Sequence, residues 1–237
     1  MKVLFKSFAV FIRQIRQDDM LIAVCFAPVL TGLLFRFGVP FAEGLLTAQG
    51  TEPAVLAPYY LLFDLFLCIV TPYIFCFVSA LVMLTEYDEN MASYLAVTPV
   101  GKRGYIISRL VFPAVLSLAA SVVFTAIFAL TVWNVPMLLA ASVLSCLQSV
   151  AVSLLLFAFS HNRVEGMALG KLSGLYLLGL FVPFFLDSWA QYLFAPLPSY
   201  WMAMMCAHAD WLLLFPALIT SVLWIWALYR RFERKLS

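Results

Sequence analysis

The sequence predicts an all-α integral membrane protein, in which one amphipathic interfacial helix is followed by six transmembrane helices. Of its 237 residues, 65% are hydrophobic and 11% are charged, whereas a soluble domain is about 45–50% apolar and about 25% charged. The mean hydropathy is +1.03. Several apolar runs also reach about 20 residues, which is the length that a helix needs to cross a bilayer.

Six apolar runs mark the predicted spans. We expect them at about 21–37, 58–84, 106–132, 135–159, 167–186 and 211–229. Because no soluble domain fits in the loops, residues 1–237 are expected to form a single transmembrane domain. The five cysteines show neither CxxC nor Cys/His spacing, so we expect no disulfide framework and no metal site.

The distribution of lysine and arginine predicts the orientation. If the N-terminus lies inside the cell, 13 of the 14 basic residues fall in cytoplasmic segments, and Arg36 is left near the outer side. Cytoplasmic loops of membrane proteins are enriched in these residues. We therefore expect a multi-pass protein of the cell membrane with both termini in the cytoplasm. The net charge of +2 gives no reason to expect nucleic acid as a partner.

Residues 1–18 are expected to form an interfacial helix. Apolar residues share one helical face and polar residues the other: Leu4, Phe5, Phe8, Phe11, Ile12 and Ile15 against Lys2, Lys6, Arg13, Arg16 and Gln17. Such a helix lies in the membrane plane with its basic face toward anionic lipid head groups. A basic flank that only orients the first span is the alternative.

Asp64 is the acid that lies clearly inside a predicted span. A carboxylate within the membrane is costly and points to a function or to a partner. Arg36, near the outer end of the first span, is the natural partner. We expect an ion pair or a hydrogen-bonded acid near the outer side, and binding of a cationic substrate is the alternative.

A charged segment, TEYDENMASYLAVTPVGKRGY, separates the second and third spans. A short amphipathic helix is expected at 85–98, because acids would occupy its first turn and Pro99 disfavours helix at the preceding residue. Tyr87, Met91, Tyr94 and Leu95 share one face, and Glu86, Glu89, Asn90 and Ser93 the other. Anionic lipid repels acids, so a protein partner explains this helix better than a lipid surface does. A solvated loop helix without a partner is the alternative.

Two further segments carry a pattern. Gly166, Gly170 and Gly174 recur every four residues on the fifth span, and such small residues let two helices approach closely, either within one chain or between two copies. Residues 187–210, between the fifth and sixth spans, are rich in Trp and Tyr and contain two prolines. They are expected to form a re-entrant or interfacial hairpin at the outer side, with a plain aromatic anchor as the alternative.

The stretch from the end of the second span into the third resembles the permease subunits of ABC-2 type transporters. These permeases commonly have acids at this point, a helix with a leucine, a Pro-Val step and a basic residue that opens the next span. The matching positions are Glu86, Asp88, Glu89, Leu95, Pro99, Val100, Lys102 and Arg109. Asn90 and Met91 depart from the usual Gly-Thr. The first helix, the six spans and the long outer segment extend the resemblance over the whole chain.

The resemblance implies that residues 85–98 are a coupling helix, which docks on a separate ATP-binding-cassette ATPase. The residues implied to contact that ATPase are Glu86, Tyr87, Asp88, Glu89, Met91, Tyr94, Leu95 and Pro99. Export of a drug, peptide or lipid would then proceed by alternating access in a homodimer or heterodimer of permeases, with ATP and Mg on the ATPase. This chain has no GxxxxGK[ST] phosphate loop, so no cofactor and no catalytic residue are expected in it.

Two other functions remain open. One is an integral membrane enzyme that acts on lipid, although the sequence lacks an HExxH pair and a convincing Ser/His/Asp or Ser/Lys set. Its histidines, His161 and His208, are predicted to fall on opposite sides of the membrane. The other is a membrane immunity or assembly protein that does not transport.

Overall fold

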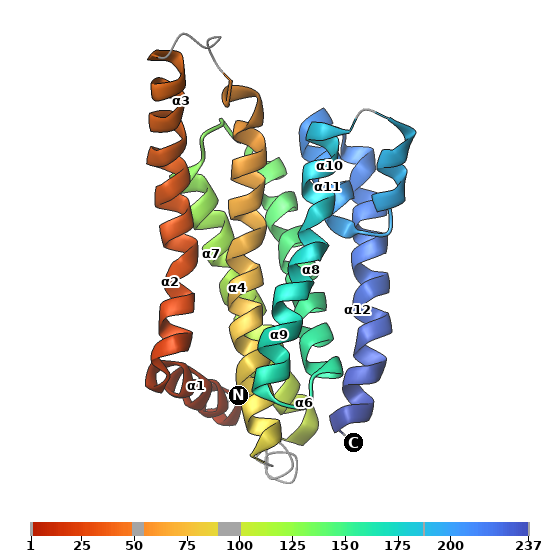
Figure 1. Cartoon of the computed structure of the whole chain (residues 1–237). Helices are drawn as coiled ribbons and strands as arrows, with labels where there is room; N and C mark the ends of the chain where they lie inside the picture. The colour runs from red at the N-terminus through yellow and green to blue at the C-terminus, as the bar shows by residue number, and fades with distance from the viewer. Residues whose placement is uncertain (1, 49–54, 90–100, 187, 237) are drawn as a thin grey trace.

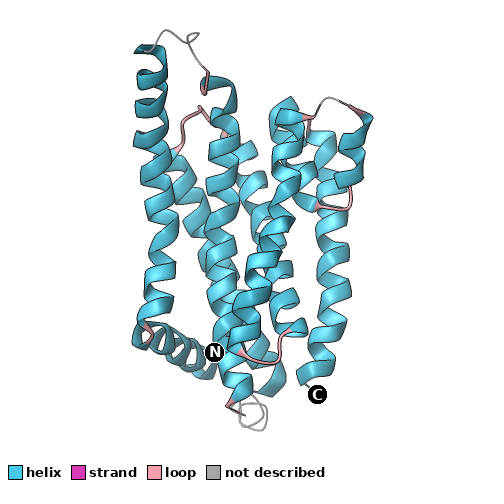
Figure 2. Ribbon diagram, in the orientation of Figure 1, coloured by secondary structure: helices cyan, strands magenta, loops and turns pink. Residues whose placement is uncertain are grey.

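The computed structural model describes residues 2–48, 55–89, 101–186 and 188–236, and this part of the chain is helical and contains no strand (Figures 1 and 2). Both termini lie at the same end of an elongated helix bundle, which we call the proximal end, and the opposite end is the distal end (Figure 1). Six helical segments in the described residues are long and apolar enough to cross a membrane. The predicted all-α membrane fold is therefore confirmed.

The first helix, α1 (Lys2–Gln17), lies across the proximal end of the bundle (Figure 1). Its apolar face contacts protein: Phe11 is 2% exposed, and Phe8 packs edge-on against Phe112 with ring centroids 5.2 Å apart. The chain turns sharply at Asp18, whose carboxylate accepts hydrogen bonds from Met20 N and Leu21 N and so caps the next helix.

The first span runs from Asp19 to Ala48 and is longer than the sequence predicted. It comprises α2 (Asp19–Leu33), a π-helical turn η1 (Leu34–Gly38) and α3 (Val39–Ala48). The expected end of this span at residue 37 was wrong, because Gly38 and Pro40 do not end the helix. A π turn, which holds one extra residue, precedes the proline and the helix continues.

The second span is the centre of the bundle. It consists of a short turn η2 (Ala57–Tyr59) and α4 (Tyr60–Asp88), and α4 packs against α2, α7, α8 and α9. Most of its side chains are buried, whereas α2 leaves large apolar side chains such as Phe26 and Leu30 exposed. An exposed apolar face of this kind is suited to lipid contact.

The third and fourth spans pack directly on α4. The third comprises α6 (Gly101–Ile106), a second π turn η3 (Ile107–Val111) and α7 (Phe112–Phe128), and the fourth is α8 (Val135–Phe159). The predicted bounds of the fourth span are confirmed. The end of the third span was predicted too late, because the helix stops at Phe128 and an irregular loop leads to α8.

Prolines inside the spans create contacts between helices. Pro113 has no N–H to donate to the carbonyl of Arg109, and Ser79 of α4 donates its hydroxyl to that carbonyl instead. In the same way Pro72 leaves the carbonyl of Cys68 free, and the hydroxyl of Ser121 donates to it at 2.7 Å. Freed backbone groups inside a membrane need such partners, so these serines join α4 to the third span.

The fifth span begins with α9 (Arg163–Ser173) and continues through η4 (Gly174–Leu177) and α10 (Leu178–Phe185). The chain then forms η5 (Trp189–Phe194) and α11 (Pro198–His208), which folds back against α8, α10 and the last span. The last span consists of η6 (Trp211–Leu213) and α12 (Leu214–Leu236).

The segment between the fifth and sixth spans reaches deep into the bundle. The indole N–H of Trp224 donates to the carbonyl of Pro196 at 2.9 Å, and the hydroxyl of Ser199 donates to the carbonyl of Tyr176 at 2.7 Å. Trp224 lies about 20 Å along the last span from its start at Trp211, as given by the helical rise. The segment therefore packs against η4 and the middle of α12.

Candidate functional site

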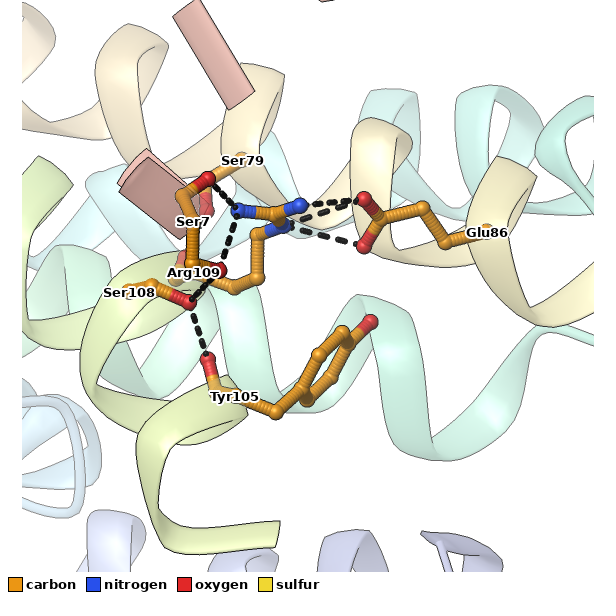
Figure 3. Close-up of polar contacts among 6 residues, drawn as sticks. All are labelled: Ser7, Ser79, Glu86, Tyr105, Ser108 and Arg109. Atoms are coloured by element: carbon orange, nitrogen blue, oxygen red, sulfur yellow. Dashed lines mark hydrogen bonds and ion pairs between the residues drawn. The ribbon is translucent and has the colours of Figure 1, made fainter. Parts of the chain in front are cut away.

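The strongest polar feature of the proximal end is a buried ion pair between two spans. Arg109 donates from Nη2 to Glu86 Oε1 at 2.6 Å and from Nε to both carboxylate oxygens at 3.0 and 3.1 Å (Figure 3). Both side chains are 1% exposed. The bidentate arrangement satisfies the carboxylate and fixes the guanidinium plane.

The same guanidinium also holds the first helix. Its Nη1 donates to the backbone carbonyl of Ser7 at 2.7 Å, and the hydroxyl of Ser7 donates to that of Ser108 at 3.0 Å (Figure 3). The ring of Phe11 lies 5.4 Å from the guanidinium carbon of Arg109, within the range of a cation–π contact. Arg109 therefore joins α1, α4 and η3 at one point.

The backbone around Arg109 departs from a regular α-helix, and the same distortion recurs around Arg36. Arg109 lies in the π turn η3 and precedes Pro113 by four residues. Arg36 lies in the π turn η1 and precedes Pro40 by four residues. In both cases the proline cannot donate to the carbonyl four residues before it, and the helix widens around the arginine. An arginine with a proline four residues after it was the sequence signal that could have pointed to both positions.

Residues 85–88 are not the start of a new helix, and this corrects the expectation for 85–98. They form the last turn of α4, in which the hydroxyl of Thr85 donates to the carbonyl of Leu81 rather than capping an N-terminus. The acidic pattern looked like a first turn, but the apolar packing of α4 extends one turn further than the hydropathy indicated. The predicted Met91, Tyr94, Leu95 and Pro99 lie outside the described residues.

The predicted contact residues before position 90 divide into two groups. Asp88 and Glu89 are exposed at the end of α4. Glu86 is buried against Arg109, and the ring of Tyr87 packs edge-on against Phe157 at 5.8 Å. The expectation that Glu86 and Tyr87 form part of a docking surface is therefore corrected, because both point into the bundle.

Lys235 of α12 strengthens the same end of the bundle. Its ammonium group donates to the carbonyl of Phe157 at 2.6 Å and to the carbonyl of Ser160, so it satisfies the C-terminus of α8. It also lies 4.6 Å from the ring centroid of Tyr87. The last span is thereby joined to the end of α4.

A second ion pair joins the turn after α1 to the start of α9. Arg163 Nη1 lies 2.5 Å from Asp18 Oδ2, and both side chains are partly exposed. The hydrogen bond from Arg163 and the two backbone N–H groups of Met20 and Leu21 hold the pKa of Asp18 below its ordinary value. Asp18 therefore acts both as a helix cap and as a link between spans.

Near the distal end, Asp64 organises the loop between α7 and α8. Its carboxylate accepts from Leu130 N at 2.8 Å, from Thr131 N at 2.9 Å and from the Thr131 hydroxyl at 2.5 Å. The indole N–H of Trp133 adds a fourth bond at 3.1 Å. Asp64 is 1% exposed, and these four hydrogen bonds satisfy its buried carboxyl group.

Arg36 binds the same loop and does not contact Asp64. Its Nη1 donates to the carbonyl of Ala129 at 2.6 Å, and the described residues contain no salt bridge between Arg36 and Asp64. Of the two expected arrangements, the described residues show the hydrogen-bonded acid and not the ion pair with Arg36, and the two side chains bind adjacent residues of one loop. Backbone groups in this irregular loop need hydrogen-bond partners, and the side chains of Arg36 and Asp64 supply them.

The glycines of the fifth span pack within the chain. A Cβ at Gly166 would collide with Leu84, and a Cβ at Gly170 would collide with Phe77, both on α4. Gly174 has open space around it. Of the two alternatives, close packing between helices of one chain therefore accounts for Gly166 and Gly170, because α4 already occupies their faces.

Two of the cavities on the described surface are large enough for a small molecule. One, which we call the lateral cavity, has a volume of about 420 Å³ and lies between α8, α9 and α12, with walls that include Leu155, Leu169, Leu172, Tyr176, Trp224 and Leu228. The other, which we call the distal pocket, has a volume of about 350 Å³ and lies between the α7–α8 loop, the start of α4 and the α11–η6 turn. Both have the size of a small-molecule site.

The histidines do not form a joint site. His161 lies in the turn between α8 and α9 at the proximal end, and His208 lies at the last residue of α11. In the described residues no group of three His, Cys, Asp or Glu side chains is arranged to hold a metal ion.

A family model and two relatives with the same description match this chain. The family model described as "Fluoroquinolones export permease protein Rv2686c-like" matches residues 11–229. The relatives "Fluoroquinolones export permease protein MT2760" of Mycobacterium tuberculosis strain CDC 1551 / Oshkosh and "Fluoroquinolones export permease protein Rv2686c" of strain ATCC 25618 / H37Rv are each 27% identical over 239 residues, covering 94% of this chain and 91% of their own. No solved structure matches. The chain belongs to the Rv2686c-like family of fluoroquinolones export permease proteins.

Proposed function

We propose that this chain is the membrane-spanning permease subunit of an ABC exporter, driven by ATP hydrolysis on a separate ATPase subunit. The observation that carries the proposal is the buried contact of Arg109 with Glu86 and Ser7, because it joins α1, α4 and η3 near the last turn of α4. Membership of a family of export permeases supports the direction of transport.

The proximal end would be the cytoplasmic end. In the structure both termini lie there, together with the end of α4, with α6 and with the turn between α8 and α9 (Figure 1). These are the parts of the chain that hold 13 of its 14 basic residues, as the positive-inside rule requires of the cytoplasmic side. An ATPase in the cytoplasm would therefore meet this end.

The coupling would act through α4. The segment 90–100 follows directly after Asp88 and Glu89, the exposed acids at the end of that helix. A force on this segment would move the end of α4, and Arg109 would carry the movement to η3 and to α1. A buried, bidentate ion pair is suited to this task because it resists sliding more than apolar packing does.

The substrate would be a hydrophobic or amphipathic drug. Both named relatives are fluoroquinolones export permease proteins, which supports a drug of similar size. The lateral cavity supports the apolar character, since leucine, valine, alanine, tyrosine and tryptophan line it with a single serine, and Leu172 in its wall is 62% exposed. A drug dissolved in the bilayer could reach such a site without crossing water.

The partner is tested by charge reversal of the exposed acids. The double variant Asp88→Lys, Glu89→Lys is expected to reduce co-purification with the ATPase subunit and to reduce drug efflux from cells, while membrane insertion stays normal. Glu233→Lys is the matched control, because Glu233 is an exposed acid at the same end on α12. If the double variant and the control retain the ATPase equally, docking at the end of α4 is wrong.

A further inference from the structure

The lateral cavity opens sideways, toward the apolar outer surface of the bundle. It is formed by α8, α9 and α12, and α8 packs against both of the other helices. The last span stands at the edge of the bundle (Figure 1). On α9 the side chains of Leu172 and Leu175 line the cavity and are 62% and 59% exposed. A hydrocarbon chain in the bilayer therefore has direct access to the cavity.

The walls of the lateral cavity are suited to a hydrocarbon chain. The hydroxyl of Ser173 is already occupied, since it donates to the carbonyl of Gly170 at 2.8 Å and lies 2.7 Å from the hydroxyl of Tyr73. The hydroxyl of Tyr176 is enclosed by protein, and its ring packs edge-on against Trp224 with centroids 6.0 Å apart. The other lining residues are leucine, valine and alanine. A polar occupant would lose its hydrogen bonds to water here without replacement, whereas a hydrocarbon chain has none to lose.

One turn beyond the cavity, toward the proximal end, two of the same helices carry an aromatic ring and a cation. Phe159 follows Leu155 by one turn of α8, and Arg231 follows Leu228 by one turn of α12, so each lies on the helix face that lines the cavity. The guanidinium carbon of Arg231 lies 4.5 Å from the ring centroid of Phe159. Arg231 is exposed, and no salt bridge between described residues includes it. The proximal rim of the cavity therefore presents a cation whose N–H donors can meet a ligand.

Two other charged side chains near this rim are already engaged within the protein. Glu165, one turn before Leu169 on α9, accepts a hydrogen bond from the backbone N–H of His161 at 2.7 Å, which holds its carboxylate at the start of that helix. Lys235, one turn after Arg231 on α12, donates to two carbonyls at the end of α8. Of these three side chains, Arg231 is the one whose charge is left for a ligand.

The position of these groups along α12 matches one leaflet of a bilayer. Trp224, which lines the cavity, lies near the middle of the last span, and Arg231 follows about 10 Å further along the helix. One leaflet contributes about 15 Å of hydrocarbon. Phe159 is the last residue of α8, and arginine side chains extend from such positions to the lipid head groups. The cavity thus lies at the depth of acyl chains, and Arg231 lies at the depth of phosphates.

We propose that the lateral cavity and Arg231 together form a binding site for a phospholipid of the leaflet at the proximal end. One acyl chain of the lipid fills the apolar cavity, and its phosphate accepts hydrogen bonds from the guanidinium of Arg231. The planar guanidinium matches the geometry of phosphate oxygens and can bind two of them at once. The exposed side chains of Leu172 and Leu175 form the wall over which the second acyl chain lies in the bilayer.

The proposal does not depend on the proposed exporter function. Binding is measured on the purified full chain in detergent, without an ATPase and without transport. If the chain also exports a drug that enters the lateral cavity, that drug must displace the acyl chain. A chain that binds the phospholipid at this site and exports no drug would contradict the exporter function and leave the lipid site intact.

The contact with phosphate is tested by native mass spectrometry of the full chain with dioleoyl phosphatidylglycerol and with dioleoylglycerol, which has the same acyl chains and no phosphate. We expect the first phospholipid to bind about tenfold more tightly than dioleoylglycerol. Arg231→Gln is expected to weaken binding of the phospholipid about fivefold to tenfold and to leave that of dioleoylglycerol unchanged. Arg230→Gln is the matched control, because the guanidinium carbon of Arg230 lies 3.8 Å from the ring centroid of Trp226 and neither residue lines the cavity. This control is expected to bind both lipids like the unaltered chain.

The contact with the acyl chain is tested by narrowing the cavity. Leu155→Trp is expected to weaken binding of both lipids, whereas Leu223→Trp, at an exposed position of α12 that does not line the cavity, is expected to change neither. The proposal is overturned if the two lipids bind the unaltered chain equally, or if the members of either pair of variants bind the phospholipid equally well. Because Arg231 and Arg230 both lie at the surface, their comparison decides the outcome even if Leu155→Trp does not fold.

Discussion

Arg109 and Glu86 are 23 positions apart in the sequence and form an ion pair at 2.6 Å that is almost completely excluded from solvent. The pair joins the second span to the third, and through Ser7 it holds the helix at the proximal end. Its burial changes the role of Glu86 from a surface contact to an internal support, and several expected outcomes follow from this.

Removal of one partner should destabilise the chain. Arg109→Met leaves the Glu86 carboxylate buried without a cation, and such a loss costs about 3–5 kcal/mol in the free energy of unfolding. The double variant Glu86→Leu, Arg109→Met should cost less than the sum of the two single variants, because it removes both charges. The free energy of unfolding in detergent is measured for the unaltered chain, the two single variants and the double variant. Additive losses of stability would show that the two side chains do not act as a pair.

Asp64→Asn should loosen the α7–α8 loop. The amide nitrogen is a donor and would face N–H groups that now donate to a carboxylate oxygen, which leaves at least one buried donor unsatisfied. The expected cost is about 1–3 kcal/mol in the free energy of unfolding. Hydrogen exchange should become faster at the amides of Leu130 and Thr131. Slow exchange at both amides in the variant would mean that the loop is held by something other than Asp64.

The glycines of the fifth span should differ in their tolerance of a methyl group. Gly170→Ala places a Cβ against Phe77 and should destabilise the chain by about 1–3 kcal/mol, as overpacking does. Gly174→Ala is the matched control, since nothing lies within 4 Å of its added methyl group. Thermal unfolding in detergent compares them. If the two variants were equally stable, close packing of α9 on α4 would not explain why glycine is found at position 170.

The link between Asp18 and Arg163 should give a small dependence of stability on pH. Because the pKa of Asp18 is lower in the folded chain than in the unfolded one, its contribution is present above the unfolded value of about 4 and is lost as the pH falls through the folded value. Both side chains are partly exposed, so the effect should be below about 1 kcal/mol.

The measurement for Asp18 compares unfolding between about pH 3 and pH 6, a range that spans the pKa of about 4 of an unfolded chain, with that of Asp18→Asn. Asparagine is an equally good helix cap, so this variant keeps the cap and removes the titration. The stability of the unaltered chain should fall more steeply toward low pH than that of the variant. Parallel curves would exclude Asp18 as a source of the dependence.

The sequence predicted the elements that depend on local composition. Apolar runs located all six spans, since a bilayer requires a minimum length of apolar helix regardless of neighbours. Helical spacing likewise located α1, and the start and end of α8 matched the prediction. These features depend on consecutive residues, so they can be predicted without knowledge of long-range contacts.

Partner choice could not be read in the same way. Glu86 stood in an acidic cluster that looked like a surface, and Asp64 had an evident partner in Arg36. The structure instead pairs Glu86 with Arg109 and gives Asp64 four donors from one loop. The glycines of the fifth span fitted two kinds of helix contact, until the packing on α4 decided between them.

What the sequence by itself determined is thus the number of long apolar helices and the presence of an amphipathic first helix, because both follow from the chemistry of each segment. What only the tertiary structure decided is which group each charged side chain contacts. A charged side chain binds the donors and acceptors that the folded chain brings to it, as the carbonyl of Ala129 does for Arg36 and the carbonyl of Ser7 for Arg109. These groups belong to segments far apart in the sequence, and they meet only when those segments pack.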